Sequence, residues 1–232
     1  MIEQRLSAED RREAIVKAVL PLFAKKGFAK TTTKELAEAA GVSEALIFKH
    51  FPSKESLYAE IQNAGCQDKD HGLEKLATLE PSTSTLVHLL YYLFRAIIMG
   101  RANDPVPWET KHRMILNSCL EDGEFTRVLY RNRFSCCFAK IRACLEAAEA
   151  SGDVVKGPAS QENRVRFAHH VAAMIAFMHL PRKPVIDYEL EREELLNQSV
   201  WFALRGLGLT DKAIAKNYNP KMLSIFFRLG NG

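Results

Sequence analysis

Residues 31–54 read TTTKELAEAAGVSEALIFKHFPSK and contain two short helical stretches joined by a tight connection. Apolar residues recur in both stretches at spacings of three and four, as on amphipathic helices. The threonine run offers an N-cap for the first stretch, and Gly41 follows its last residue. Ser43 offers an N-cap for the second stretch, which Pro52 ends. Because glycine adopts a positive φ without steric cost, the pattern predicts two helices that meet at a steep angle.

Two helices in this relation form a helix-turn-helix, whose second helix enters the major groove of DNA. The alternative is a compact helical unit that binds no DNA, and the same apolar residues serve either case. The residues expected to hold the two helices together are Leu36, Ala37, Ala40, Val42, Ile47 and Phe51.

The starts of three predicted helices are candidate phosphate contacts. Free backbone N–H groups at a helix N-terminus attract phosphate. The helices begin beside Thr33, Ser43 and Lys54, whose side chains add two hydroxyl groups and one positive charge. Contacts of this kind position a protein on DNA without reading its sequence.

The face of the second helix that lies away from its apolar positions carries the candidate base contacts. Lys49 can donate to guanine O6 and N7, Glu44 can accept from cytosine N4, and Ala45 can contact a thymine methyl group. The candidates on or beside this face are Glu44, Ala45, Phe48 and Lys49.

Composition permits this function without requiring it. The chain has 232 residues, with 32 Lys and Arg against 28 Asp and Glu, so its net charge is +4. A weakly basic chain has modest non-specific affinity for DNA at physiological salt. Its five cysteines, with no export signal, indicate reduced thiols in a cytoplasmic protein. The apolar run 86–99 contains His88 and Arg95 and is too short to span a membrane.

The motif residues resemble the DNA-binding domain of the TetR/AcrR family of transcriptional regulators. The match covers about residues 9–69 and includes Gly27-Phe28 at the end of the first helix. The family usually has tyrosine where Phe48 stands and a small or hydroxylated residue where Leu46 stands. The DNA contacts expected from spacing and resemblance together are Thr32, Thr33, Ser43, Glu44, Ala45, Leu46, Phe48, Lys49, His50 and Lys54.

The resemblance implies an all-α fold with two domains. The first is a three-helix DNA-binding domain at 9–69, with its helix-turn-helix at about 32–51. The second is a larger helical ligand-binding and dimerisation domain at 70–232. Periodicity predicts a first helix that ends near Lys26, and later helices near 54–78, 83–101, 107–121, 123–151, 161–180 and 187–207. The apolar tail beyond Thr210 is expected to dock on the subunit or on its partner.

In the family, the second domain holds a small, often apolar effector, and its last two long helices form the homodimer. Here those helices are 161–180 and 187–207. The implied function is a repressor that a ligand releases from an inverted-repeat operator in double-stranded DNA. Large flexible or aromatic side chains suit an adaptable pocket, although ordinary core packing explains them as well. The candidate pocket residues are Phe94, Trp108, Met114, Phe134, Phe138, Met174, Phe177 and Met178.

Two other classes of function are compatible with parts of the sequence. An enzyme or small-molecule carrier could keep the helical scaffold, but no catalytic constellation or phosphate-binding loop stands out, so no catalytic residue or cofactor is expected. A thiol- or metal-responsive DNA-binding sensor could use Cys136-Cys137, with Cys119 and Cys144 nearby. The spacing lacks a Cys-x-x-Cys motif, and the adjacent His169 and His170 point apart on a helix, so no metal site is expected.

Overall fold

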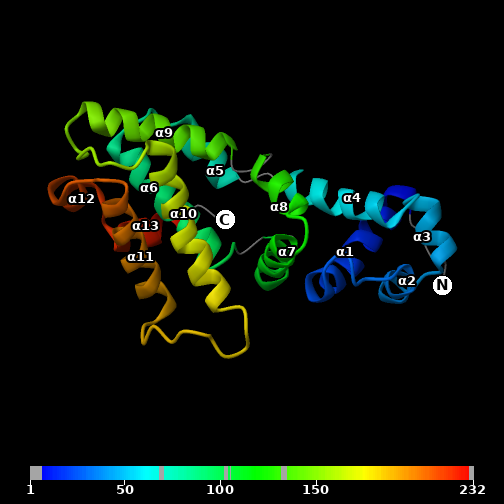
Figure 1. Cartoon of the computed structure of the whole chain (residues 1–232). Coiled ribbons are helices and arrows are strands. Elements are labelled where there is room, and N and C mark those ends of the chain that lie inside the picture. Colours follow the sequence, from blue (N-terminus) through cyan, green and yellow to red (C-terminus); the bar gives the residue numbers. More distant parts are fainter. Residues whose placement is uncertain (1–6, 68–70, 102–103, 105, 132–134, 230–232) are drawn as a thin grey trace. The chain divides into compact units, whose positions relative to one another are not determined.

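The computed structural model describes residues 7–67, 71–101, 104, 106–131 and 135–229, which belong to two compact units (Figure 1). One unit spans residues 1–68 and 105–132, and the other spans 69–104 and 133–232. The regular secondary structure of the described residues is helical and includes no strand; their one isolated β-bridge joins Val154 to Leu209. The expected all-α fold is therefore confirmed.

The N-terminal unit combines the expected DNA-binding helices with a later pair of helices. Asn117 donates to the backbone carbonyl of Ala24 at 2.8 Å, and the Phe125 and Tyr58 rings lie 5.8 Å apart between centroids. These contacts join the later pair to the first and fourth helices, so the unit is larger than the segment 9–69. Its helices are α1 (Ala8–Lys26), α2 (Thr33–Ala40), α3 (Glu44–His50), α4 (Lys54–Gln67), α7 (Trp108–Leu120) and α8 (Glu124–Leu129).

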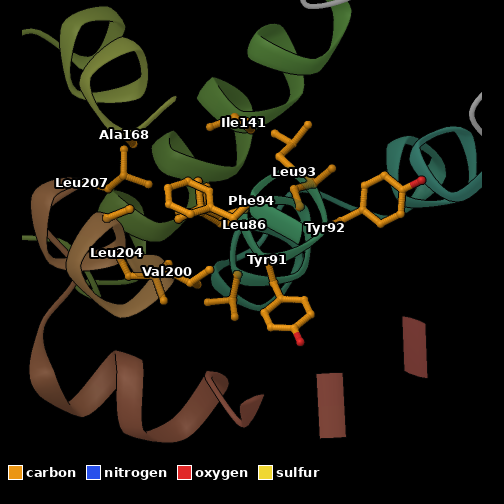
Figure 2. Packing of buried hydrophobic residues seen from close by; sticks show 14 of the residues in the cluster. Leu86, Tyr91, Tyr92, Leu93, Phe94, Ile141, Ala168, Val200, Leu204 and Leu207 are labelled. Atoms are coloured by element: carbon orange, nitrogen blue, oxygen red, sulfur yellow. The ribbon is translucent and has the colours of Figure 1, made fainter. Parts of the chain in front are cut away.

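The C-terminal unit is built around α6, a helix that is apolar on nearly every side. Figure 2 shows Tyr91 and Tyr92 diverging from α6, while Phe94 points toward Ala168 and Leu207. Tyr91 and Phe94 are almost fully buried. The helices of this unit are α5 (His71–Thr78), α6 (Thr83–Ile98), α9 (Ser135–Ala150), α10 (Gln161–Met178), α11 (Arg192–Gly206), α12 (Asp211–Asn217) and α13 (Pro220–Leu229).

Three predicted helices differ from those in the structure. The segment predicted at 54–78 contains α4 and α5, and the segment at 123–151 contains α8 and α9. The helix predicted at 187–207 begins only at Arg192. Asp187 accepts a hydrogen bond from the Glu189 backbone N–H at 2.9 Å, and Glu189 has a φ of 54°. Such a local side-chain bond competes with helix formation and delays the start of α11.

The C-terminal tail docks on its own unit through α13. The Phe227 ring stacks on Tyr91 with centroids 5.8 Å apart, and Leu223 is also buried. Tyr218, just before α13, donates from its hydroxyl to the Asn197 carbonyl at 2.9 Å. Of the two placements expected for the tail, the structure therefore shows docking on the subunit itself.

No helix in the described part of the chain has the length and hydropathy needed to cross a membrane.

Candidate DNA interface

One side of α3 is buried and the other is open. Ile47 is 2% exposed and belongs to the core of the N-terminal unit, as do Leu36 and Phe51. The next residue on α3, Phe48, is turned away from this core and is 42% exposed. Leu46 and His50, two of the expected DNA contacts, are half-buried. The other expected contacts on this side are exposed, namely Ser43, Glu44, Ala45 and Lys49.

Two of the hydroxyl groups expected to contact DNA act as helix caps in the structure. Thr32 accepts from the Glu35 backbone N–H at 3.3 Å, and Ser43 accepts from the Leu46 N–H at 3.2 Å. A serine hydroxyl keeps its own O–H donor when it accepts such a bond. Thr33 instead donates to the Glu44 carboxylate at 2.8 Å. Two expected DNA contacts are thus bonded to each other in the absence of DNA.

Glu35 closes a capping box at the start of α2 and also pairs with Lys26. The Lys26 hydrogen bond, followed by bonds from Thr32, lowers the pKa of Glu35 from 4.5 to about 2. The ionised carboxylate therefore stabilises the fold above pH 4.5, and this contribution is lost as the pH falls toward 2.

We expect an NMR pH titration to give Glu35 a pKa of about 2. Lys26→Met should raise this pKa toward the ordinary value because it removes the largest cause of the shift. Lys25→Met removes an adjacent exposed charge and should leave the Glu35 titration in place. An equal effect of the two substitutions would show that general charge, rather than the hydrogen bond, lowers the pKa.

Lys54 holds the loop between α1 and α2. Its Nζ donates to the carbonyls of Phe28 and Thr31, each at 3.0 Å, and lies 4.2 Å from the centroid of the Phe28 ring. The sequence suggested a phosphate contact for this lysine. Two of its three N–H groups are directed to protein carbonyls, so Lys54 positions the loop that leads into the helix-turn-helix.

Lys54→Met should lower the free energy of unfolding by about 1.5–3 kcal/mol, the range for hydrogen bonds that involve a charged group. Urea denaturation followed by circular dichroism measures this change. Lys34→Met is the matched control, because it removes an equal charge from an exposed position on α2. Equal stability losses in the two variants would contradict the positioning role.

Arg12 of α1 fixes the end of α3 and is not among the residues predicted from the sequence. One guanidinium nitrogen donates to the His50 carbonyl at 2.5 Å, and another pairs with Glu60 at 2.9 Å. The guanidinium also lies 4.5 Å from the centroid of the Phe51 ring. Arg12 thereby satisfies a terminal helix carbonyl and sets the direction of α3. Arg12 lies one turn before the buried Ile15, and this position could have predicted that its side chain faces the core.

Glu121 lies just beyond α7 and binds backbone N–H groups of the same α1–α2 loop. Its carboxylate accepts from the backbone N–H groups of Phe28 and Ala29, each at 3.3 Å. Gly27 leaves room for this carboxylate, since a Cβ at that position would lie 2.4 Å from Glu121 Oε1. Movement of α7 would therefore act on the loop that precedes α2.

The expected pocket residues are divided between the two compact units. Phe94 and Phe138 line a cavity of about 10 Å³ in the C-terminal unit. Met174 is 54% exposed on α10 and points out of the core. Trp108 and Met114 belong to the N-terminal unit, where Met114 is buried. Phe177 and Met178 are half-buried and do not line this cavity, and Phe134 lies outside the described residues.

The expected dimer helices α10 and α11 carry large exposed apolar side chains. Trp201 and Phe202 border a groove of about 580 Å³ that reaches Pro220 at the start of α13. An exposed apolar area of this kind is typical of a protein–protein interface. The exposed residues are Phe167, Met174, Trp201 and Phe202.

Cysteines do not form a metal site in the described residues. Cys137 and Cys144 are buried, and Cys119 is exposed. Burial raises the pKa of the Cys144 thiol, which disfavours the reactive thiolate. The side chain of Cys136 lies outside the described residues. No group of three or more potential ligands lies close enough to hold a metal in the part of the chain that the structure covers.

Comparison with known proteins agrees with this helical arrangement. Residues 15–61 match the family described as "Bacterial regulatory proteins, tetR family". The chain is 48% identical over 48 residues to the uncharacterized HTH-type transcriptional regulator YerO of Bacillus subtilis (strain 168), which covers 21% of this chain and 17% of YerO. It is 34% identical over 83 residues to the HTH-type transcriptional repressor KstR2 of Rhodococcus jostii (strain RHA1), which covers 32% and 41%. The chain thus matches less than half the length of either relative.

The likeness to solved structures extends over most of the chain. AibR, solved with isovaleryl coenzyme A and operator DNA, superposes with a TM-score of 0.60 at 17% identity, over 83% of this chain and 97% of AibR. At this identity the likeness shows a shared fold. Residues 15–61 therefore form a domain of the TetR family of bacterial regulatory proteins.

Proposed function

We propose that this protein is a cytoplasmic repressor of transcription that binds an inverted-repeat operator as a homodimer. The observation that carries the proposal is α3, which has one side packed in the core and an open side with Ala45, Phe48 and Lys49. A short helix presented in this way can enter the major groove. Two copies, one per subunit, would read half-sites spaced by about one helical turn, roughly 34–36 Å.

Dimerisation through α10 and α11 would bury their exposed apolar side chains, among them Trp201 and Phe202. A dimer would also contact DNA through two recognition helices, which compensates for the modest DNA affinity of a weakly basic chain. Support for operator release by a ligand comes from two sources. The C-terminal unit holds an apolar cavity, and AibR was solved with both a coenzyme A ester and operator DNA.

Release requires a ligand that binds the two states of the dimer with different affinity. Glu121 and Lys54 both bind the α1–α2 loop. Glu121 accepts hydrogen bonds from the loop's backbone N–H groups, and Lys54 donates hydrogen bonds to the loop's backbone carbonyls. A shift of α7 would change the first set of bonds and reorient α2 and α3. This gives the two DNA-binding states a concrete structural difference.

Selection from a random pool of double-stranded DNA tests the proposal. The purified full chain is used at a fixed salt concentration of about 150 mM, since affinity for DNA depends steeply on salt. Enrichment of an inverted repeat is the expected result. Enrichment of a single half-site would contradict the dimer, and failure to enrich any sequence would contradict sequence-specific binding.

In the thiol- or metal-responsive alternative, a thiol response would fall to Cys119 among the described cysteines, because Cys137 and Cys144 are buried. Its direct check is the affinity for the selected DNA with and without a reducing agent or a chelator. The proposed repressor should show the same affinity in both conditions.

A further inference from the structure

The small cavity of the C-terminal unit has a buried end and a partly exposed end. It lies among α6, α9 and α10, with Leu207 closing one side. At the buried end Phe94 and Ile141 are each 1% exposed and Leu207 is fully buried. Phe138 and His169 are only partly buried, and their rings lie edge to face with centroids 5.9 Å apart. These two rings therefore mark the side on which the cavity approaches solvent.

His169 is the one cavity-lining residue with a polar side chain, among the residues that the structure describes. The other lining residues are Leu90, Leu93, Phe94, Ile97, Phe138, Ile141, Val165, Ala168 and Leu207. A ligand that buried polar atoms among these hydrocarbon side chains would lose their hydrogen bonds to water without replacement. A ligand for this cavity therefore has an apolar body and at most one polar group, placed at His169.

The imidazole also restricts what that polar group is. Histidine can donate a hydrogen bond from a ring nitrogen and can carry a positive charge near neutral pH. No Asp or Glu is among the described residues that line the cavity, so a negative group meets no like charge from them. We propose that the effector is an apolar carboxylic acid whose carboxylate accepts a hydrogen bond from His169 and whose alkyl or aryl part fills the buried end. This inference rests on the proposed function and names the effector class for it.

Occupation requires the cavity to enlarge. Its present volume of about 10 Å³ holds no more than one water molecule. Phe138 and Ile97 are only partly buried, so enlargement of the cavity on their side costs less packing than enlargement at the buried wall. An acid that binds only the enlarged cavity would shift the protein toward that state, as ligand-dependent release from DNA requires.

Calorimetric titration of the full chain tests the acid site without DNA. The probes are straight-chain carboxylates from butanoate to dodecanoate, together with the matching primary alcohols. The best acid should bind at least about tenfold more tightly than its alcohol, since a hydrogen bond between charged groups is worth one to two factors of ten. If no acid in the series binds, or if the alcohols bind as tightly as the acids, the proposal is wrong.

Variants at His169 assign the effect to this residue. His169→Leu should remove the preference for acid over alcohol, whereas His169→Gln, which keeps an N–H donor, should retain part of it. His88→Leu is the control, because His88 is a partly buried histidine on α6 that does not line the cavity, whereas the His170 ring contacts the His169 ring with centroids 5.8 Å apart. A preference for acid that survives in His169→Leu, or that disappears in His88→Leu, would overturn the assignment.

The outcomes for the effector and for the regulator are separable. The best acid, added to the complex with the selected operator, should release the DNA from the native chain. If the DNA selection enriched no sequence, the proposal of a repressor would be wrong, but the calorimetric evidence for acid binding would be unaffected. Tight acid binding without release of a bound operator would contradict the acid as an effector, although the protein would still bind DNA.

Discussion

Arg164→Met should lower the free energy of unfolding of the C-terminal unit by about 3–5 kcal/mol, the cost of breaking a buried ion pair from one side. Arg164 is 8% exposed. It donates to the Leu207 carbonyl at 2.7 Å and pairs with Glu149 at 2.8 Å. The substitution leaves a carbonyl and a largely buried carboxylate without this partner. Denaturation by urea, followed by circular dichroism, measures the loss.

Two further variants separate the ion pair from a loss of charge alone. Arg166→Met removes an exposed arginine two residues away and should change stability by less than about 0.5 kcal/mol. The double variant Arg164→Met with Glu149→Met should recover much of the loss, because it removes the stranded carboxylate and fills the space with apolar atoms. If the single Arg164 variant behaved like the Arg166 variant, the pair would not hold α9, α10 and the end of α11 together.

The place of Arg164 also explains why Gly208 follows α11. Gly208 has a φ of 98°, a conformation that favours glycine. A Cβ there would lie 2.7 Å from the Val155 carbonyl oxygen and 3.0 Å from Arg164 Nη1. The chain passes too close to the arginine and the bridge at Val154 to accept a side chain.

Sequence reasoning succeeded where the bonds are local. The caps at Thr32 and Ser43 join residues three positions apart, and Gly41 supplies the left-handed conformation that ends α2. Such bonds depend on residue type and spacing, both of which are visible in the sequence. The helix-turn-helix was therefore predictable almost residue by residue.

The contacts that orient these helices were not predictable, because they join distant residues. Arg12 and the His50 carbonyl are 38 positions apart, and Glu121 and Phe28 are 93 apart. An amphipathic pattern tells which side of α7 is buried but not which helix covers it. The joining of α7 and α8 to the N-terminal unit, and the cavity around Phe94, both required the structure.

The pocket residues show the same limit. Methionine and aromatic residues suit adaptable pockets, but residue type does not decide which side of a helix meets a cavity. Met174 faces outward on α10, while His169 on the same helix lines the cavity. A difference of five positions along an α-helix moves a side chain well off its original face.

Lys49→Ala should both weaken operator binding and change the preferred sequence, provided that α3 reads the major groove. Lys49 is exposed on the open side of α3, one residue after Phe48. A good contact from lysine to guanine contributes about 1–3 kcal/mol of discrimination, and a dimer makes it twice. The combined loss of about 2–6 kcal/mol corresponds to a decrease in affinity of roughly 30-fold to more than 10,000-fold.

The change in preference distinguishes a base contact from a phosphate contact. Selection with the Lys49→Ala variant should relax one position in each half-site, symmetrically about the centre of the inverted repeat. Lys212→Ala, which removes an exposed charge from α12, should leave both the affinity and the selected sequence unchanged. If Lys49→Ala instead weakened binding to every sequence equally and reduced its salt dependence, Lys49 would contact phosphate. Base recognition would then fall to Glu44 and Ala45, because they share the open side of α3.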